Sequence, residues 1–148
     1  MTVSALDAPG APACLVEIAG RTFAVEIAQA REAREFTEIT VVPLAPPPMI
    51  GMANLRGSIV PVIDVALLLS LPPASRGRSV RTLVVEAGGV RLAAAVDRVL
   101  GVESLPEEAG AALEDTRGFE RGRLLRGDDP VPVLDVAKIV ELVERWKA

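Results

Sequence analysis

The chain has 148 residues, of which 50% are hydrophobic and only 3% aromatic, and its formal net charge is −4. It has no histidine and one cysteine, which excludes histidine-based catalysis, metal sites built from imidazole or several thiolates, and an internal disulfide. An acidic chain poor in aromatic rings is also unsuited to binding nucleic acid, because such binding needs basic surfaces and aromatic side chains that stack on bases. We therefore predict no cofactor, no metal and no nucleic-acid partner.

No stretch reaches the ~18 uncharged apolar residues that a membrane span needs. The N-terminus also lacks the basic start and apolar run of a signal peptide. These features predict a cytoplasmic protein without direct membrane insertion. Cys14 lies in an apolar run, where a buried and inert thiol is expected.

The start of the chain predicts a tail followed by strands. Residues 1–12 are rich in Ala, Pro and Gly and are expected to be a flexible N-terminal tail. Apolar runs on either side of Gly20 predict a β-hairpin. Residues 28–38 are charged and alanine-rich, a composition that by itself suggests a helix, and residues 39–42 again read as a strand.

The proline run at 46–48 ends this strand and forces an extended bend. One short helical turn is expected at 49–53. A tight turn is expected at 54–57, because Asn and Gly tolerate positive φ. Residues 58–65 predict a buried strand, with Pro61 at a sheet edge or bulge.

The strand pattern starts again beyond a Pro/Gly/Ser-rich linker at 72–79. A second hairpin is predicted around the Gly88-Gly89 turn, and strand character continues to Val102. Residues 106–122 read as acidic and irregular, and another turn is expected at 127–129. A C-terminal helix is predicted, because apolar residues recur at spacings of three and four. These residues are Val136, Ile139, Val140, Val143 and Trp146.

Two blocks of sequence recur in the same order. VPVIDVA at 60–66 and VPVLDVA at 131–137 differ at one position and are offset by 71, and LVEIAG at 15–20 aligns with LVVEAG at 83–88 at an offset of 68. Each repeated unit is too small to bury much surface alone, so the two are expected to pack together and to bind partners in the groove between them. The predicted divisions are a first barrel at about 13–71, a linker at 72–79, a second barrel at about 80–134 and a helix at about 135–147.

The repeat duplicates an aspartate, giving Asp64 and Asp135. Symmetry-related aspartates can form a carboxyl-protease dyad, but that chemistry needs a Gly-rich turn and a following hydroxyl residue, and here Val-Ala follows each one. The simpler interpretation is that each aspartate ends a strand and caps the helical turn behind it. Asp97, at the end of another strand, is likewise interpreted as structural.

Residues 51–64, GMANLRGSIVPVID, resemble the signature of the CheW family of chemotaxis coupling proteins. Further matches at the first hairpin, at 96–99 and at 122–135 extend the resemblance over about residues 14–145. It implies an all-β fold of two similar SH3-like five-stranded barrels plus the C-terminal helix, within a single CheW-like domain at 13–148.

The resemblance also implies a function without catalysis. Such adaptors couple the cytoplasmic tips of chemoreceptors (methyl-accepting proteins) to the regulatory domain of a CheA-type histidine kinase, and they are recruited to membrane receptor arrays. Residues that bind the kinase are not assigned. The receptor-facing residues that the resemblance implies are Ala30, Glu32, Gly51, Asn54, Arg56, Val99 and Val102.

Each of these positions also has a structural interpretation. Asn54 can be a turn former, Arg56 can be a paired guanidinium that holds its loop, and Val99 and Val102 can belong to the core.

The chain departs from the family after the first hairpin. Related proteins carry branched aliphatic residues where this chain has Ala30 and Ala33. Each replacement removes about 1 kcal/mol of apolar burial if it lies at an interface. A specialised coupler that binds only one of the two partners therefore remains an alternative, as does an aspartate-based hydrolase that uses Asp64 and Asp135.

Overall fold

The structure is a computed structural model and describes residues 11–73, 77–107 and 118–146. The predicted tail at 1–12 lies outside the described residues except for Ala11 and Pro12, which begin the first strand. Within the described ranges, every helix is too short or too polar to cross a membrane.

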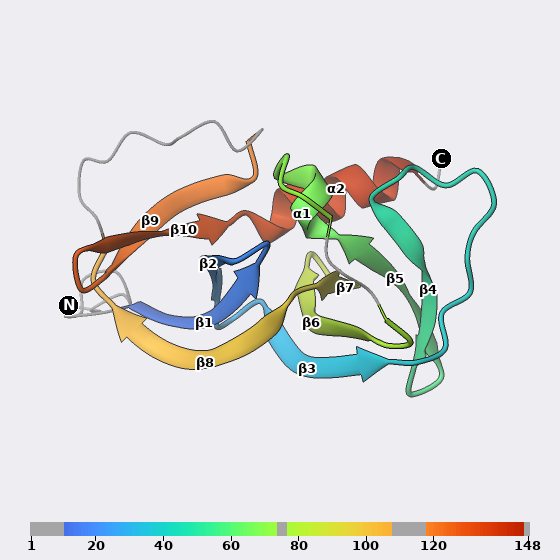
Figure 1. Cartoon of the computed structure of the whole chain (residues 1–148), viewed down its shortest axis with the longest axis horizontal. Helices are drawn as coiled ribbons and strands as arrows, with labels where there is room; N and C mark the ends of the chain where they lie inside the picture. The colour runs from blue at the N-terminus through green and yellow to red at the C-terminus, as the bar shows by residue number, and fades with distance from the viewer. Residues whose placement is uncertain (1–10, 74–76, 108–117, 147–148) are drawn as a thin grey trace.

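The described residues form ten strands and two helices (Figure 1). The strands of the first half are β1 (Ala11–Ile18), β2 (Arg21–Glu26), β3 (Ala30–Phe36), β4 (Met49–Leu55) and β5 (Ser58–Asp64). Those of the second half are β6 (Val80–Ala87), β7 (Val90–Ala95), β8 (Arg98–Leu105), β9 (Glu120–Arg126) and β10 (Asp129–Leu134). The helices are α1 (Val65–Leu68) and α2 (Val136–Trp146). The prediction of an all-β fold with a C-terminal helix is confirmed.

Two five-stranded sheets lie side by side along the length of the molecule, as Figure 1 shows. The first sheet has the order β8-β1-β2-β10-β9, and the second has the order β3-β6-β7-β5-β4. The sheets correspond strand for strand. Each has a hairpin at its centre, β1–β2 or β6–β7, and each has one parallel pair, β10 with β2 or β5 with β7.

The two repeats exchange strands. After the β1–β2 hairpin the chain crosses to the second sheet, where β3 pairs with β6, and after the β6–β7 hairpin it crosses back, so that β8 pairs with β1. Each sheet therefore contains strands from both repeats, which differs from a division into barrels at about 13–71 and 80–134. Local sequence patterns predict strands, but they do not say which strands pair.

The hairpins correspond at an offset of 69 residues, not 68. The turns lie at Ala19-Gly20 and Gly88-Gly89. Leu15 packs in the interior of the first sheet, and its counterpart in the interior of the second is Val84, while Leu83 faces the other way. A slip of one residue moves every side chain to the opposite face of a strand, so the alignment of Leu15 with Leu83 was wrong.

Three apolar clusters hold this arrangement together. The interior of the first sheet contains Ala13, Leu15, Ala24, Leu105, Leu124, Val131 and Val133. The interior of the second contains Phe36, Ala53, Leu55, Val60, Val62, Val80, Val84, Ala93 and Ala95. The third, which we call the interface cluster, joins the outer faces of the two hairpins to the helices, and includes Cys14, Val16, Phe23, Val25, Leu83, Val85, Leu92, Ala94, Val136 and Ile139. The central hairpins are thus buried on both faces, which explains their continuous apolar runs.

Three of the local predictions differ from the structure. The charged segment at 28–38 forms β3 rather than a helix, and its exposure alternates from residue to residue because it pairs with β6 as an edge strand. Residues 49–53 belong to β4 rather than to a helical turn, because they pair with β5. Pro61 lies inside β5 and not at a sheet edge, and the ladder with β7 begins only at Val62.

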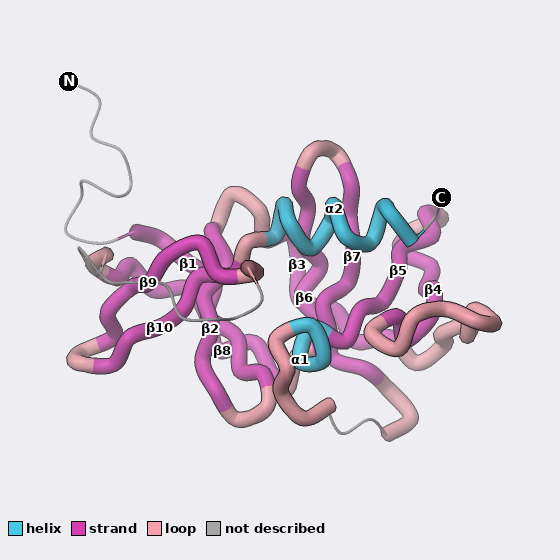
Figure 2. Tube along the Cα trace, turned by 90° about the horizontal axis from the view of Figure 1, so that it is seen from above, coloured by secondary structure: helices cyan, strands magenta, loops and turns pink. Residues whose placement is uncertain are grey.

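Helix α2 follows the prediction. Asp135 caps it, since its Oδ1 accepts a hydrogen bond from the backbone N–H of Lys138 at 3.1 Å. Val136, Ile139, Val140 and Val143 are buried. Figure 2 shows α2 lying along the second sheet, and its contacts are with β6 and β7.

We predict that Ile139→Asp destabilises the protein by about 4 kcal/mol or more, because it removes a buried side chain and places a charge in an apolar cluster. Thermal and urea unfolding measure this loss. Ala137→Asp is the matched control, because Ala137 is exposed on the same helix. Equal stability of the two variants would mean that α2 is not part of the core.

Because the two repeats exchange strands, we predict that the two fragments of a cleaved chain stay associated. A protease site that replaces residues 74–76 separates β1–β5 from β6–β10, yet each fragment completes the sheet of the other. The cut protein should elute from a size-exclusion column as one species and separate only in denaturant. Two folded fragments that separate in native buffer would contradict the exchange.

Candidate functional site

The turn between β4 and β5 holds two of the predicted site residues. Arg56 and Gly57 have φ values of 51° and 86°, and positive φ at both central residues is typical of a type I′ hairpin turn. The side-chain Oδ1 of Asn54 accepts a hydrogen bond from the N–H of Gly57 at 2.8 Å. The predicted tight turn is confirmed, and Asn54 forms it.

Arg56 reaches from this turn to β3. Its guanidinium donates to Oε2 of Glu32 at 2.5 Å, and Arg34 lies 3.9 Å from the other oxygen. The hydrogen bond from Arg56 lowers the pKa of Glu32, with smaller contributions from the charges of Arg56, Arg34 and Arg91. The side chain of Arg56 remains 63% exposed, so the pair adds little stability and leaves the guanidinium accessible to a partner.

This pair joins opposite edges of the second sheet, since β3 and β4 are its outermost strands. The first sheet has a similar contact, in which Arg126 of β9 donates two hydrogen bonds to Glu103 of β8, at 2.7 and 3.3 Å. In both sheets, an Arg–Glu contact therefore links the two outer strands or the turn beside them. The Leu-Arg-Gly sequence recurs at 55–57 and 125–127, and this signal in the sequence could have revealed the second arginine.

Ala30, Val99 and Val102 lie where the two sheets meet. Ala30 of β3 and Val99 of β8 are half-buried and pack against the interface cluster. Val102 is 60% exposed. A hollow of about 360 Å³ opens beside Val99, between β3, β6 and β8. It is lined by Ala33, Arg34, Glu35, Arg81, Thr82, Arg98 and Val99. We call this junction of β3 and β8 the seam.

The alanines of β3 correspond to valines of β8. Ala30 of β3 pairs with Val85, and Val99 of β8 pairs with the equivalent residue of the other hairpin, Val16. In the same way, Ala33 pairs with Leu83, and Val102 pairs with its equivalent, Cys14. Each edge strand carries a bulge at the same place. The β3 side of the seam thus exposes less apolar surface than the β8 side.

Gly51 is the predicted site residue that is buried. A Cβ added there would lie 2.5 Å from the backbone oxygen of Thr40 and 2.6 Å from Cγ2 of Ile39. Only glycine lets the segment after β3 approach β4 so closely. The seven predicted residues therefore fall into three groups: Ala30, Val99 and Val102 at the seam, Glu32, Asn54 and Arg56 around the turn, and Gly51 inside.

The repeated aspartates lie at strand ends, as predicted. Asp135 caps α2 through its side chain, whereas Asp64 occupies the N-cap position of α1 without a side-chain capping hydrogen bond. Asp64 has no exposed surface, so a substrate cannot reach its carboxyl group. Asp97 is structural, because its Oδ2 accepts a hydrogen bond from the N–H of Gly20 in the β1–β2 turn at 3.0 Å.

Cys14 is buried, and burial raises the pKa of its thiol, so the thiolate is disfavoured. In the part of the chain that the structure describes, no three Cys, Asp or Glu side chains gather as the ligands of a metal ion would.

Comparisons with known proteins agree with this fold. A family model described as a CheW-like domain matches residues 12–144. A probable chemotaxis protein CheW from Rhizobium etli is 42% identical over 57 residues, which are 38% of this chain and 37% of that protein. The crystal structure of the scaffolding protein TtCheW from Thermoanaerobacter tengcongensis matches with a TM-score of 0.73 at 23% identity, covering 84% of this chain and 88% of that one.

The match to the solved structure shows a shared fold of two packed five-stranded sheets with a C-terminal helix. Since the family model covers nearly all of the sequence, the chain belongs to the CheW-like domain family.

We predict that substitution of two corresponding glycines changes the stability of the protein by different amounts. Gly51→Ala should destabilise the protein by about 1–3 kcal/mol, because the new methyl group collides with backbone at Thr40. Gly122→Ala is the control, since Gly122 pairs with Val133 as Gly51 pairs with Val62, and a Cβ there meets no described atom within 4 Å. Urea unfolding of both variants measures the difference. Equal losses would show that the contact with Thr40 is not what requires glycine.

Proposed function

We propose that the chain is a non-catalytic cytoplasmic adaptor that couples chemoreceptor tips to a CheA-type histidine kinase within membrane receptor arrays. The observation that carries the proposal is the aliphatic surface at the seam, where Val102 is 60% exposed beside the half-buried Val99. Membership of the CheW-like family supports the same role.

The chemistry of the seam suits a receptor hairpin. An amphipathic helix binds by laying its apolar face into an apolar groove, and the flanking charged residues fix its orientation. At the seam, Val99 of β8 lines the same hollow as the charged side chains of Arg34, Arg81 and Arg98. Arg56, exposed and held in place by Glu32, adds a guanidinium suited to carboxylate or carbonyl groups of a partner.

The proposed adaptor has to bind both partners, which separate titrations test. Calorimetry with a receptor signalling fragment and, in a second experiment, with a kinase regulatory domain should give saturable binding in each case. If the chain bound neither the receptor fragment nor the kinase domain, the proposal would be contradicted.

A form that binds only one partner is the second candidate. The observation that favours it is the pair Ala30 and Ala33, which stand where the other repeat has Val99 and Val102. Each alanine lacks two carbons of a valine, which costs about 1 kcal/mol of apolar burial at an interface. The two titrations separate this candidate from the full adaptor.

We predict that Val102→Asp lowers affinity for the receptor fragment about tenfold or more, because it places a charge in an apolar contact. Val41→Asp is the matched control, since Val41 is also exposed, at 74%, but lies in the loop between β3 and β4. Calorimetric titration of both variants measures the effect, and circular dichroism confirms that both fold. Equal affinities of the two variants would exclude the seam as the receptor site.

A further inference from the structure

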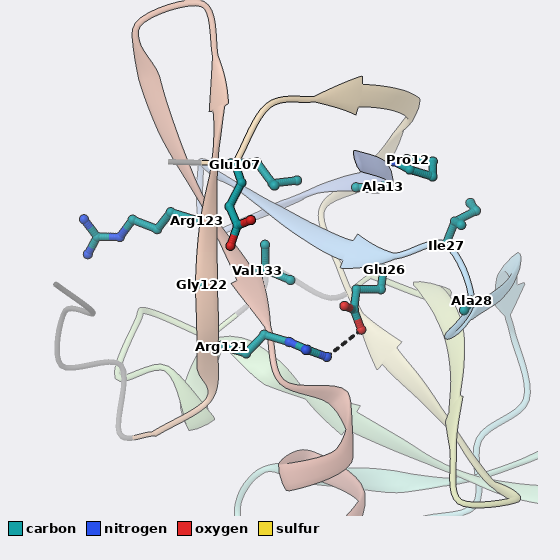
Figure 3. Close-up of a pocket in the computed structure, with 11 residues that line it drawn as sticks. Pro12, Ala13, Glu26, Ile27, Ala28, Glu107, Arg121, Gly122, Arg123 and Val133 are labelled. Atoms are coloured by element: carbon teal, nitrogen blue, oxygen red, sulfur yellow. Dashed lines mark hydrogen bonds and ion pairs between the residues drawn. The ribbon is translucent and has the colours of Figure 1, made fainter. Parts of the chain in front are cut away.

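A second hollow lies in the first sheet, and none of the seven predicted site residues lines it. Its volume is about 260 Å³, which is small for a ligand pocket but enough for one aliphatic side chain. Figure 3 shows it between the end of β2, the start of β1, and the β9–β10 hairpin. Its apolar lining is Pro12, Ala13, Ile27, Ala28, Leu124 and Val133. We call it the Gly122 hollow, because Gly122 forms part of its wall.

The duplication shows what fills the corresponding place in the second sheet. There Gly51 pairs with Val62 as Gly122 pairs with Val133. The side chain of Ile39 packs over Gly51 and against the interior of the second sheet. Thr40 holds this segment in extended form, since it exchanges two backbone hydrogen bonds of 2.8 Å with Met52.

The first sheet has a glutamate where the second has this isoleucine. In the second sheet, the bridge between Thr40 and Met52 places Ile39 opposite Ala53. In the first sheet, a bridge places Glu107 opposite Leu124, which is the counterpart of Ala53. Glu107 is exposed, and a carboxylate cannot fill an apolar hollow without losing its hydration. Among the described residues nothing lies within 4 Å of a Cβ built on Gly122, so no described side chain takes the place that Ile39 takes over Gly51.

We propose that the Gly122 hollow receives a branched aliphatic side chain carried on an extended segment of a partner protein. The charges at the rim add a second element of specificity. Arg121 is engaged with Glu26 at 2.7 Å, as the dashed line in Figure 3 marks, and Arg123, the other arginine of the lining, with Glu120 at 2.7 Å, whereas the carboxylate of Glu107 is exposed. The matching segment therefore carries a lysine or arginine next to its aliphatic residue. This site is independent of the proposed receptor contact at the seam.

Short peptides test the proposal on the full-length chain. The probe is acetyl-Lys-Ile-Thr-Val-amide, and the control peptides replace its Ile by Asp or its Lys by Glu. In NMR titrations the probe should shift the signals of Leu124, Val133 and Ile27 in a saturable way. The Asp peptide should cause no shift, and the Glu peptide should bind several-fold more weakly, because Glu107 repels it.

Variants that fill the hollow complete the test. Gly122→Ile should raise the peptide Kd about tenfold or more, and Gly122→Ala, which disturbs the fold least, should raise it by less. Gly77→Ile, at an exposed glycine in the linker with open space around it, should leave the Kd unchanged. Binding that survives Gly122→Ile, equal binding of the Asp peptide, or no shift at millimolar peptide would overturn the proposal. Dilution-dependent shifts of the same signals without peptide would assign the hollow to a second copy of the chain and would overturn it as well.

Discussion

Burial of the β1–β2 and β6–β7 hairpins on both faces is the constraint on which the rest of this structure depends. One face of each hairpin fills the interior of its own sheet, and the other packs into the interface cluster. A repeat of this size cannot cover both faces of its hairpin, because too little of its surface is buried on folding. The exchange of β3 and β8 solves this problem, since each repeat extends the hairpin of the other.

The same exchange creates the surfaces available to partners. As each chain segment crosses between sheets, it leaves an edge strand at the junction, and β3 and β8 together with β6 line the hollow there. Exposed Arg–Glu pairs also link the outermost strands of each sheet, although they add little stability. Because β3 is paired along β6 and β8 along β1, the aliphatic groups of the junction lie on ordered backbone, and less conformational entropy is lost on binding than with a flexible loop.

Much of the fold could be predicted from the sequence, because the VPVIDVA repeat and the periodicity of α2 are strong local signals. The exchange of strands between the repeats could not be predicted, since strand pairing depends on long-range contacts that leave no local pattern in the sequence. β3 has the composition of a helix, and only its pairing with β6 makes it a strand. Glu32 and Arg56 were both predicted as site residues, but their mutual ion pair was not foreseen, because 24 residues separate them in the sequence and only the folded chain brings them together.

If a chemoreceptor covers the seam, as we propose, its binding should slow the labelling of a thiol placed there. Cys14 is buried with a raised pKa, so a cysteine introduced by Val102→Cys would be the reactive thiol of that variant, and Val41→Cys gives an exposed reference away from the seam. Because Val102 lies opposite Cys14 in the β1–β8 ladder, a phosphine reductant is kept present to prevent a cross-strand disulfide. Alkylation of each variant would be timed with and without a saturating receptor signalling fragment. The account predicts that the fragment slows labelling at position 102 at least about tenfold and leaves position 41 unchanged, as expected if an apolar contact excludes the reagent. Equal labelling rates at position 102 with and without bound fragment would contradict it.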